Sequence, residues 1–476
     1  MSPGGLPTGG ESSDHILNYG HLDIDRPRQF LLPCTHKLAD DTSNGNYGLV
    51  VDSFQPINQH KREGKMKKKQ ATCIVAALSF LLILGFSVQA LAGETYNIAL
   101  SLAITGPTSD VGNPYSKGAE DYVKYVNDEK LLGDDKLVVF IKDDGYKTEV
   151  TKRNFEDFLD EDIVFYLNYS TGSTIALRQD FQEEKIPVLP ASFFSGNLQE
   201  NDYVFLPIAS YSSQAVGLAE YVAANHKGSS KPKVALFIHP SAFGRAPLGN
   251  VKKAIEIGLP IELVEVVEHG KDLDNTAMLK RFQSKGVQYV ISQTVQPPVA
   301  TMLKGAQSLG MIASTYGEEG KITFLGCHYA GGPALVTLAG SAANENYYWT
   351  TSYKMMTAKG PGRDAQFALA KRYGRDEKVA KDANYTNGIM VVQVAVETIR
   401  RAKAKGKKIT RAALYEELLA MNGFNSFNSL TTVGPVSFSK TDREGVDTLQ
   451  LYVSKGGLFY EIGAPFVSEY VQKLKQ

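Results

Sequence analysis

Residues 163–189, IVFYLNYSTGSTIALRQDFQEEKIPVL, contain the pattern that decides the fold. The apolar run at 163–167 has the length and composition of a buried strand, and a turn rich in hydroxyl groups follows it. Residues 175–184 have the pattern of a helix, and Val188 and Leu189 form a further short strand. This order predicts one unit of a parallel sheet with its crossover helix.

The same alternation extends over both halves of the chain. Before this stretch, short strands are predicted at 96–100 and 137–141, with a helix between them. After residue 209 a second series begins, with strands predicted at 234–238, 261–267, 287–291 and 322–325. Aliphatic strands that alternate with helices are typical of parallel sheets covered on both faces. We therefore expect an α/β protein with two doubly wound, Rossmann-like lobes.

The composition excludes several classes of protein. The 476 residues include 51 Lys plus Arg and 51 Asp plus Glu, so the formal net charge is zero. A nucleic-acid-binding protein is expected to carry a basic surface, so this balance argues against one. Three cysteines are too few for a disulfide scaffold. The one cysteine after residue 92, Cys327, is expected to be a buried, small apolar residue.

The first 92 residues differ from the rest. Residues 1–65 are rich in Gly, Ser, Asp, Asn and Pro, and we expect a disordered or non-native extension there. Residues 66–92 begin with lysines, continue with an apolar run and end with small residues. This is the pattern of a secretory signal peptide cleaved after Ala92. The alternative is an uncleaved membrane anchor with a cytoplasmic tail. Both interpretations place residues 93–476 outside the cytoplasm.

The usual motifs of catalysis and cofactor binding are missing. The sequence has no GxGxxG, GxxxxGK[ST], HExxH, CxxC or GxSxG pattern. The four histidines after residue 92 lack the mutual spacing of metal ligands; they are His226, His239, His269 and His328. We therefore expect no metal, no cofactor and no enzyme activity.

The turn between strand 163–167 and helix 175–184 carries the strongest sign of a binding site. It brings hydroxyl and backbone N–H groups to a helix start, which suits an anion, although ordinary capping would need only one hydroxyl. A second segment, Ala191 to Ser195, follows the next strand and faces the same edge of the sheet, where ligands bind in open α/β folds. Its two phenylalanines suggest a ligand with an apolar or aromatic body, with core packing as the equal alternative.

Several pieces of sequence, taken in order, resemble a known family. They are Ile104 to Pro107, Lys142 to Asp144, Ser170 to Thr174, Ile186 to Leu189, Gly326 to Gly340, Gly434 to Phe438 and Gly456 to Phe459. Together with the signal peptide, this order is similar to that of the periplasmic type I solute-binding proteins. It is closest to the branched-chain amino-acid-binding branch, which serves ABC transporters. The resemblance covers nearly all of residues 95–462.

The resemblance implies two lobes joined by a three-stranded hinge that bends to close on a ligand. Lobe 1 would comprise residues 93–208 and 352–446, and lobe 2 residues 209–351 and 447–476. The protein would be a monomeric periplasmic receptor that captures a small molecule and delivers it to an ABC permease in the inner membrane. Two alternatives are a membrane-anchored sensory ectodomain and, less favoured, an exported enzyme.

The resemblance also implies which residues hold the ligand. In amino-acid binders of this type, the serine-rich turn and the loop after the next strand hold the α-carboxylate and help to hold the ammonium group. An aromatic residue from lobe 2 covers the ligand. Two further positions in lobe 2 are also expected to contact the ligand. The full set of corresponding residues in this chain is Ser170, Thr171, Ser173, Thr174, Ser192, Phe193, Phe243, Gln296 and His328.

His328 departs from the family pattern, in which an acidic residue pairs with the ammonium group of the ligand. A neutral histidine carries no charge to offset that ammonium, and losing a charge-assisted partner costs about 1.5–3 kcal/mol. We therefore expect a carboxylate without an ammonium group, aromatic or aliphatic, to which His328 could donate a hydrogen bond. A shift of the alignment by one residue would put Cys327 or Tyr329 at this position instead.

Overall fold

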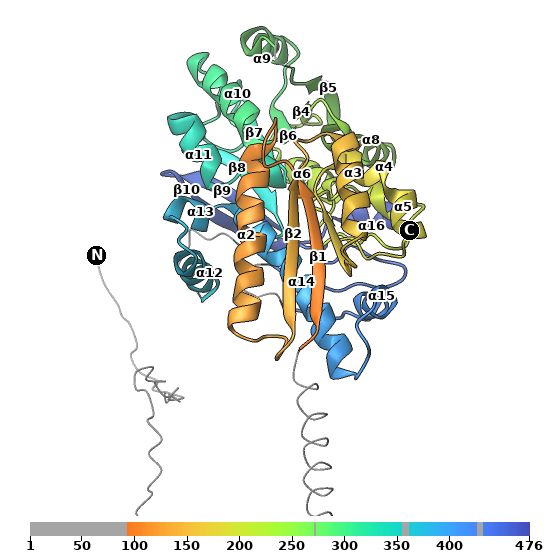
Figure 1. Cartoon of the computed structure of the whole chain (residues 1–476). Coiled ribbons are helices and arrows are strands. Elements are labelled where there is room, and N and C mark those ends of the chain that lie inside the picture. The colour runs from red at the N-terminus through yellow and green to blue at the C-terminus, as the bar shows by residue number, and fades with distance from the viewer. Residues whose placement is uncertain (1–92, 271–272, 355–360, 426–431) are drawn as a thin grey trace, which may run out of the picture. The chain divides into compact units, whose positions relative to one another are not determined.

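The computed structural model describes residues 93–270, 273–354, 361–425 and 432–476. The predicted extension 1–65 and signal peptide 66–92 lie outside these residues. Within the described ranges, no helix is long and apolar enough to cross a membrane. The strands form two sheets built mainly of parallel pairs and flanked by helices, which confirms the predicted α/β class (Figure 1).

Three parallel strands form the first sheet, in the order β2–β1–β3. They are β1 (Thr95–Leu102), β2 (Lys136–Asp143) and β3 (Phe165–Asn168). Side chains of β1 alternate between the faces, so Ile98 and Leu100 join one apolar cluster and Ala99 joins another. The first cluster includes α2 (Ser109–Asp128) and α14 (Ala383–Ala404); the second includes α3 (Thr148–Leu159) and α5 (Arg178–Glu183). We call this sheet and these helices the first sheet unit.

The second sheet has seven strands in the order β10–β9–β8–β7–β6–β4–β5. Its parallel strands are β4 (Lys233–Ile238), β5 (Glu262–Glu268), β6 (Tyr289–Gln293), β7 (Thr323–Gly326) and β8 (Glu345–Thr351). The antiparallel pair β9 (Leu449–Lys455) and β10 (Leu458–Phe466) completes it. Helices α6 (Tyr211–Asn225), α8 (Leu248–Glu256) and α16 (Glu469–Lys475) pack in one apolar cluster; α9 (Asn275–Ser284), α10 (Gln296–Ser308) and α11 (Pro333–Ala339) pack in another. We call this assembly the second sheet unit.

The remaining elements are short or lie outside the two sheets. The helices are α4 (Thr171–Ala176), α7 (Ala242–Arg245), α12 (Pro361–Arg372), α13 (Glu377–Ala380) and α15 (Arg411–Leu419). The 3₁₀ turns are η2 (Ser195–Leu198), η3 (His328–Ala330) and η4 (Gly340–Ala343). The lobe boundaries near residues 208, 351 and 446 stay a prediction.

Two local predictions are wrong in detail. The helix expected at 175–184 begins at Thr171, because the Ser170 hydroxyl caps it, and it is divided into α4 and α5 at Leu177. The strand expected at 188–189 is only an isolated bridge at Val188, which lies between two prolines that cannot donate to a ladder. The burial expected for Cys327 is confirmed.

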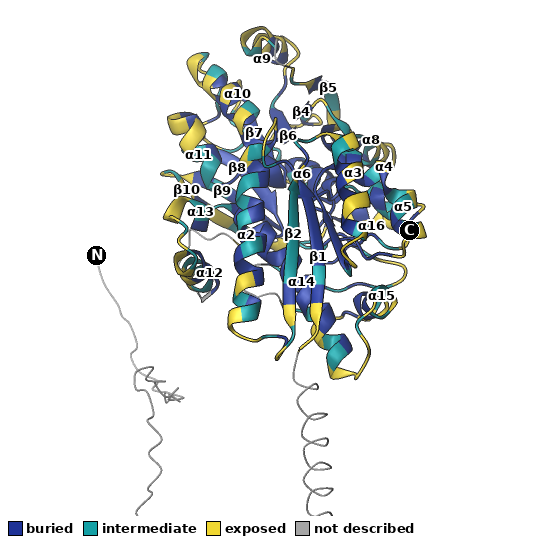
Figure 2. Ribbon diagram, in the orientation of Figure 1, coloured by how far each residue is buried: buried dark blue, intermediate teal, exposed yellow. Residues whose placement is uncertain are grey.

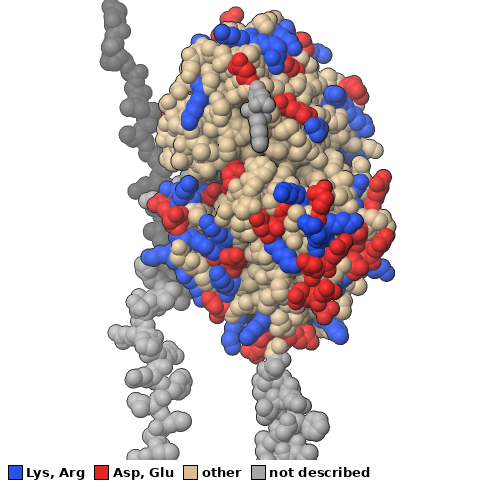
Figure 3. Space-filling model, turned by 45° about the horizontal axis from the view of Figure 1, so that its top comes forward, with Lys and Arg blue, Asp and Glu red and all other residues tan. Residues whose placement is uncertain are grey.

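The surface follows from this packing. Figure 2 shows helices with a buried side towards the sheets and an exposed side outwards. On the face drawn in Figure 3, basic and acidic side chains are intermixed, as the balanced composition suggests.

The crossing of α2 and α14 depends on two glycines. A Cβ atom at Gly118 would lie 2.2 Å from the carbonyl oxygen of Tyr385, and one at Gly388 would lie 2.0 Å from that of Tyr115. These distances are far shorter than van der Waals contact, so only glycine allows the two helix backbones to approach this closely.

We expect Gly388→Ala to destabilise the protein by about 1–3 kcal/mol, because the added methyl group forces the two helix backbones apart. Urea unfolding monitored by circular dichroism measures this loss. Gly249→Ala is the matched control, since this glycine also lies in a helix but has nothing within 4 Å of its Cβ position. Equal unfolding midpoints for the two variants would contradict the assignment.

Candidate ligand-binding site

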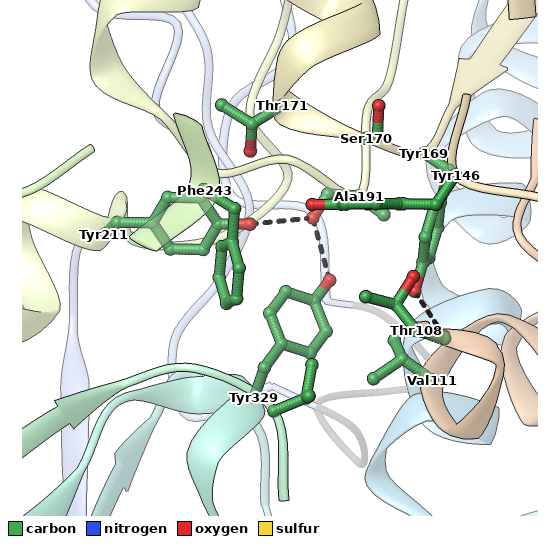
Figure 4. A pocket seen from close by; sticks show the side chains of 11 residues that line it. Thr108, Val111, Tyr146, Tyr169, Ser170, Thr171, Ala191, Tyr211, Phe243 and Tyr329 are labelled. Carbon is green, nitrogen blue, oxygen red and sulfur yellow. Dashed lines mark hydrogen bonds between the residues drawn. The ribbon is translucent and has the colours of Figure 1, made fainter. Parts of the chain in front are cut away.

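A small cavity lies between the carboxyl ends of the strands of the two sheets. Its volume is about 290 Å³ when the open solvent at its mouth is included. The first sheet unit and its loops supply Thr108, Val111, Tyr146, Tyr169, Ser170, Thr171 and Ala191; the second supplies Tyr211, Phe243, Val295 and Tyr329 (Figure 4). This is the edge at which open α/β folds bind ligands.

The lining is aromatic and uncharged. Four tyrosines and one phenylalanine surround the cavity, and none of the eleven lining residues carries a charged side chain. Burial raises the pKa of the hydroxyl groups of Tyr146, Tyr169, Tyr211 and Tyr329, so all four stay neutral at pH 7. The site therefore offers ring surfaces and neutral hydroxyl groups to a ligand.

The predicted hydroxyl-rich turn is largely occupied by its own hydrogen bonds. Ser170 Oγ accepts a hydrogen bond from the backbone N–H of Ser173 at 3.1 Å, which caps α4. Asn168 Nδ2 donates to Ser173 Oγ at 3.2 Å and to Thr174 Oγ1 at 2.8 Å. Ser170 lines the cavity, whereas Ser173 and Thr174 do not. These two hydroxyl groups hold the turn in shape.

Thr171 keeps a hydrogen-bond donor for the cavity. Ser192 Oγ donates to Thr171 Oγ1 at 2.8 Å and accepts from Asn197 Nδ2 at 3.1 Å. Because Thr171 accepts in this pair, its own proton can be donated, either to the neighbouring Tyr211 hydroxyl or to a ligand. A second lining hydroxyl, Thr108 Oγ1, is buried and has no hydrogen-bond partner in the described protein. The cavity thus contains two hydroxyl groups that can donate to a bound oxygen.

The two predicted phenylalanines lie at different depths. Phe243 lines the cavity and packs edge-on against Tyr211 and Tyr329, with ring centroids 5.2 Å and 5.8 Å apart. Phe193 does not line the cavity. Its ring lies parallel to that of Tyr329, at a centroid distance of 5.7 Å and an angle of 5°. Phe193 therefore supports the cavity wall from behind.

Gln296 and His328 do not line this cavity either. Gln296 Nε2 donates to the carbonyl oxygen of Gly331 at 2.7 Å. His328 is buried: its Nδ1 shares a hydrogen bond with Thr351 Oγ1 at 2.7 Å, and its carbonyl oxygen accepts from Trp349 Nε1 at 2.8 Å. Burial lowers the pKa of the His328 side chain to about 3, so the ring is neutral. A direct contact between His328 and the ligand stays a prediction.

Of the four lining tyrosines, only Tyr329 was named from the sequence, and that as an alternative to His328. Three of them follow strands within three residues of the strand end: Tyr146 after β2, Tyr169 after β3 and Tyr329 after β7. Tyr211 is the first residue of α6 and comes directly after the cap residue Ser210. Strand-end position would have identified the first three, because that edge of the sheet was already expected to bind the ligand.

Comparisons with known proteins show similarity over most of the chain. The profile of a family described as "Periplasmic binding protein" matches residues 95–457. A crystal structure of a branched-chain amino acid ABC transporter protein from Thermus thermophilus with bound valine is 40% identical in sequence. The match covers 81% of this chain and 99% of that one, with a TM-score of 0.75.

More distant proteins are also similar to this chain. The leucine-, isoleucine-, valine-, threonine- and alanine-binding protein of Pseudomonas aeruginosa is 22% identical over 257 residues, which are 53% of this chain and 68% of that protein. A solute-binding protein of R. palustris in complex with 4-hydroxybenzoate is 16% identical, with a TM-score of 0.65. That match covers 79% of this chain and 98% of the other.

The buried neutral His328 makes stability depend on pH in a defined direction. In the unfolded chain a histidine takes up a proton below about pH 6.5, whereas the folded protein keeps His328 neutral down to about pH 3. Acidification therefore favours unfolding. We expect the free energy of unfolding to fall by about 1.4 kcal/mol per pH unit from this residue alone between pH 6 and pH 4.

Urea unfolding of the wild type and His328→Asn at several pH values measures this contribution. The variant should show a shallower dependence on pH over that window, whatever its stability at pH 7. Parallel curves for the two proteins would show that His328 takes up its proton in the folded state.

Proposed function

Because the chain belongs to the periplasmic binding protein family, whose members bind small solutes for ABC transporters, we propose that it is the receptor of an ABC importer. It captures a small organic solute in the cavity between the two sheet units, closes on it and delivers it to a membrane permease. The proposed place of action is the periplasm, reached through the signal peptide at 66–92. N-terminal sequencing of the exported protein tests this, with Gly93 expected as the first residue.

The chemistry of the cavity lining carries the proposal for the ligand. We propose a small carboxylate without an ammonium group, with a compact aliphatic or aromatic body. Thr171 and Thr108 have hydroxyl protons available for the carboxylate, and the tyrosine and phenylalanine rings enclose the apolar part. No lining residue carries a charge, so either ionic group would be held by neutral groups alone, and the two threonine hydroxyl groups can donate to a carboxylate but not to an ammonium group.

Valine and other branched-chain amino acids form the second candidate class. The observation that favours them is the 40% identity to the Thermus thermophilus protein with bound valine. The tyrosine rings offer one way to hold an ammonium group, because the face of an aromatic ring attracts a cation, by about 0.5–2 kcal/mol. The two classes differ in that single group, so they can be compared directly.

Matched pairs of solutes separate the two candidates. We would measure the melting temperature of the protein with valine and 3-methylbutyrate, and with phenylalanine and 3-phenylpropionate. A solute at about 100 times its dissociation constant stabilises the fold by about 2.7 kcal/mol, which is visible as a shift. A rise in melting temperature with the carboxylates alone supports a ligand without an ammonium group. A rise with valine alone contradicts that ligand class but still supports the function as a receptor.

The two threonines are the residues to change. We expect Thr171→Val and Thr108→Val each to weaken binding of the best solute about ten- to a hundredfold, because each removes a hydrogen bond to a charged group. Isothermal titration calorimetry measures the affinity. Thr337→Val is the control, since that exposed hydroxyl lies on α11, outside the cavity. Unchanged affinity in both cavity variants would remove these hydroxyl groups from the site.

A further inference from the structure

A row of hydrogen bonds connects the cavity wall to the segment that follows β8. Tyr353 Oη lies 2.7 Å from Asn387 Oδ1, and Asn387 Nδ2 lies 2.9 Å from Tyr329 Oη. Tyr329 Oη in turn lies 2.8 Å from the carbonyl oxygen of Ala191. Tyr329, Tyr353 and Asn387 are each at most 7% exposed, so water does not compete strongly for these bonds.

The carbonyl oxygen of Ala191, at the end of this row, determines which group donates in each of the hydrogen bonds. A carbonyl oxygen can only accept, so the Tyr329 hydroxyl must donate to Ala191. With its proton used, Tyr329 Oη must accept from the amide nitrogen of Asn387. The amide oxygen of Asn387 then faces Tyr353, whose hydroxyl donates to it. The Ala191 carbonyl therefore leaves one arrangement of the Asn387 amide.

These contacts join the two sheet units. Tyr329 follows β7 in the second unit, whereas Ala191 lies in the loops of the first and Asn387 lies on α14. The ring of Tyr329 also packs in parallel against Phe193, which adds an apolar contact between the units. Tyr353 comes two residues after β8, where its carbonyl oxygen accepts from Tyr452 Oη at 2.9 Å.

We propose that this row is a latch between the two sheet units, and that Asn387 and Tyr353 are positioning residues that orient the Tyr329 hydroxyl towards Ala191. The arrangement in which Tyr329 bonds to Ala191 is called closed below. The latch favours the closed arrangement even without a ligand. The larger the closed population is beforehand, the less of the free energy of ligand binding is needed for closure. The inference deepens the proposed function, because it concerns the same cavity.

The latch also restricts what Tyr329 can do for a ligand. Its proton is committed to Ala191, so the side chain offers a ring face and an oxygen that can only accept. Neither Asn387 nor Tyr353 lines the cavity. A change in affinity on altering them must therefore pass through Tyr329 and the closed arrangement.

The test measures the ratio of open to closed molecules without ligand. Spin labels at the exposed positions Glu156 on α3 and Lys280 on α9 report the distance between the units by pulsed electron resonance. The full chain is used, with Cys34→Ser and Cys73→Ser to prevent unwanted labelling. Cys327 can remain, because it is buried and its pKa is raised by burial.

Four variants separate a latch from general packing. Tyr329→Phe, Asn387→Leu and Tyr353→Phe each break the row and should raise the ratio of open to closed molecules about two- to tenfold, the range expected for one hydrogen bond. Tyr347→Phe is the matched control. It also removes a buried bond from a tyrosine hydroxyl to a carbonyl, that of Ala330 at 2.6 Å, but both groups lie in the second unit. Its ratio should equal that of the wild type.

A double variant shows whether Asn387 acts through Tyr329. In a Tyr329→Phe background, Asn387→Leu should cause no further opening. The proposal is overturned if the two changes add, if Asn387→Leu and Tyr353→Phe leave the ratio unchanged, or if the wild type has no closed population. Solute binding is a separate readout: if no solute shifts the melting temperature, the proposed function fails while the ligand-free ratio still decides on the latch.

Discussion

The carbonyl oxygen of Ala191 is a buried acceptor through which the first sheet unit contacts the second. A buried carbonyl needs a donor, and nothing else in the first sheet unit supplies one in the described residues, so Tyr329 reaches across from the second unit, with Tyr211 Oη at 3.4 Å. This requirement places two tyrosine rings over the cavity. The position of Phe243 follows, because its ring packs against both of them. One backbone acceptor thus organises the aromatic wall of the site.

An uncharged lining has consequences for how selectivity arises. With no charged side chain around the cavity, discrimination between solutes rests on the shape of the aromatic wall and on a few hydroxyl groups. Such hydroxyl groups reject a ligand mainly when it leaves them unpaired, because an unsatisfied buried donor costs more than a made bond gains. Solved structures that share this fold hold solutes as different as valine and 4-hydroxybenzoate.

Much of the fold could be predicted from the sequence, and less of the site. The parallel strands were recognisable because each is a short aliphatic run, and the hydroxyl-rich turn because its residue types are unusual beside a strand. Ser170, Thr171 and Phe243 were named in advance and line the cavity. The roles of Ser173 and Thr174 within the turn depend on Asn168, whose side chain the linear pattern does not connect to them. Tyr329 depends on contacts with residues 138 and 58 positions away, which no local pattern contains.

The position of Trp349 has a practical consequence. It is the one tryptophan of the chain, it is fully buried in β8, and its indole N–H bonds to the residue that precedes Tyr329. Light absorbed at the red edge of the protein spectrum therefore excites a single indole close to the wall of the cavity. Its emission wavelength follows the polarity around η3, so an unlabelled sample contains its own optical reporter of rearrangements there.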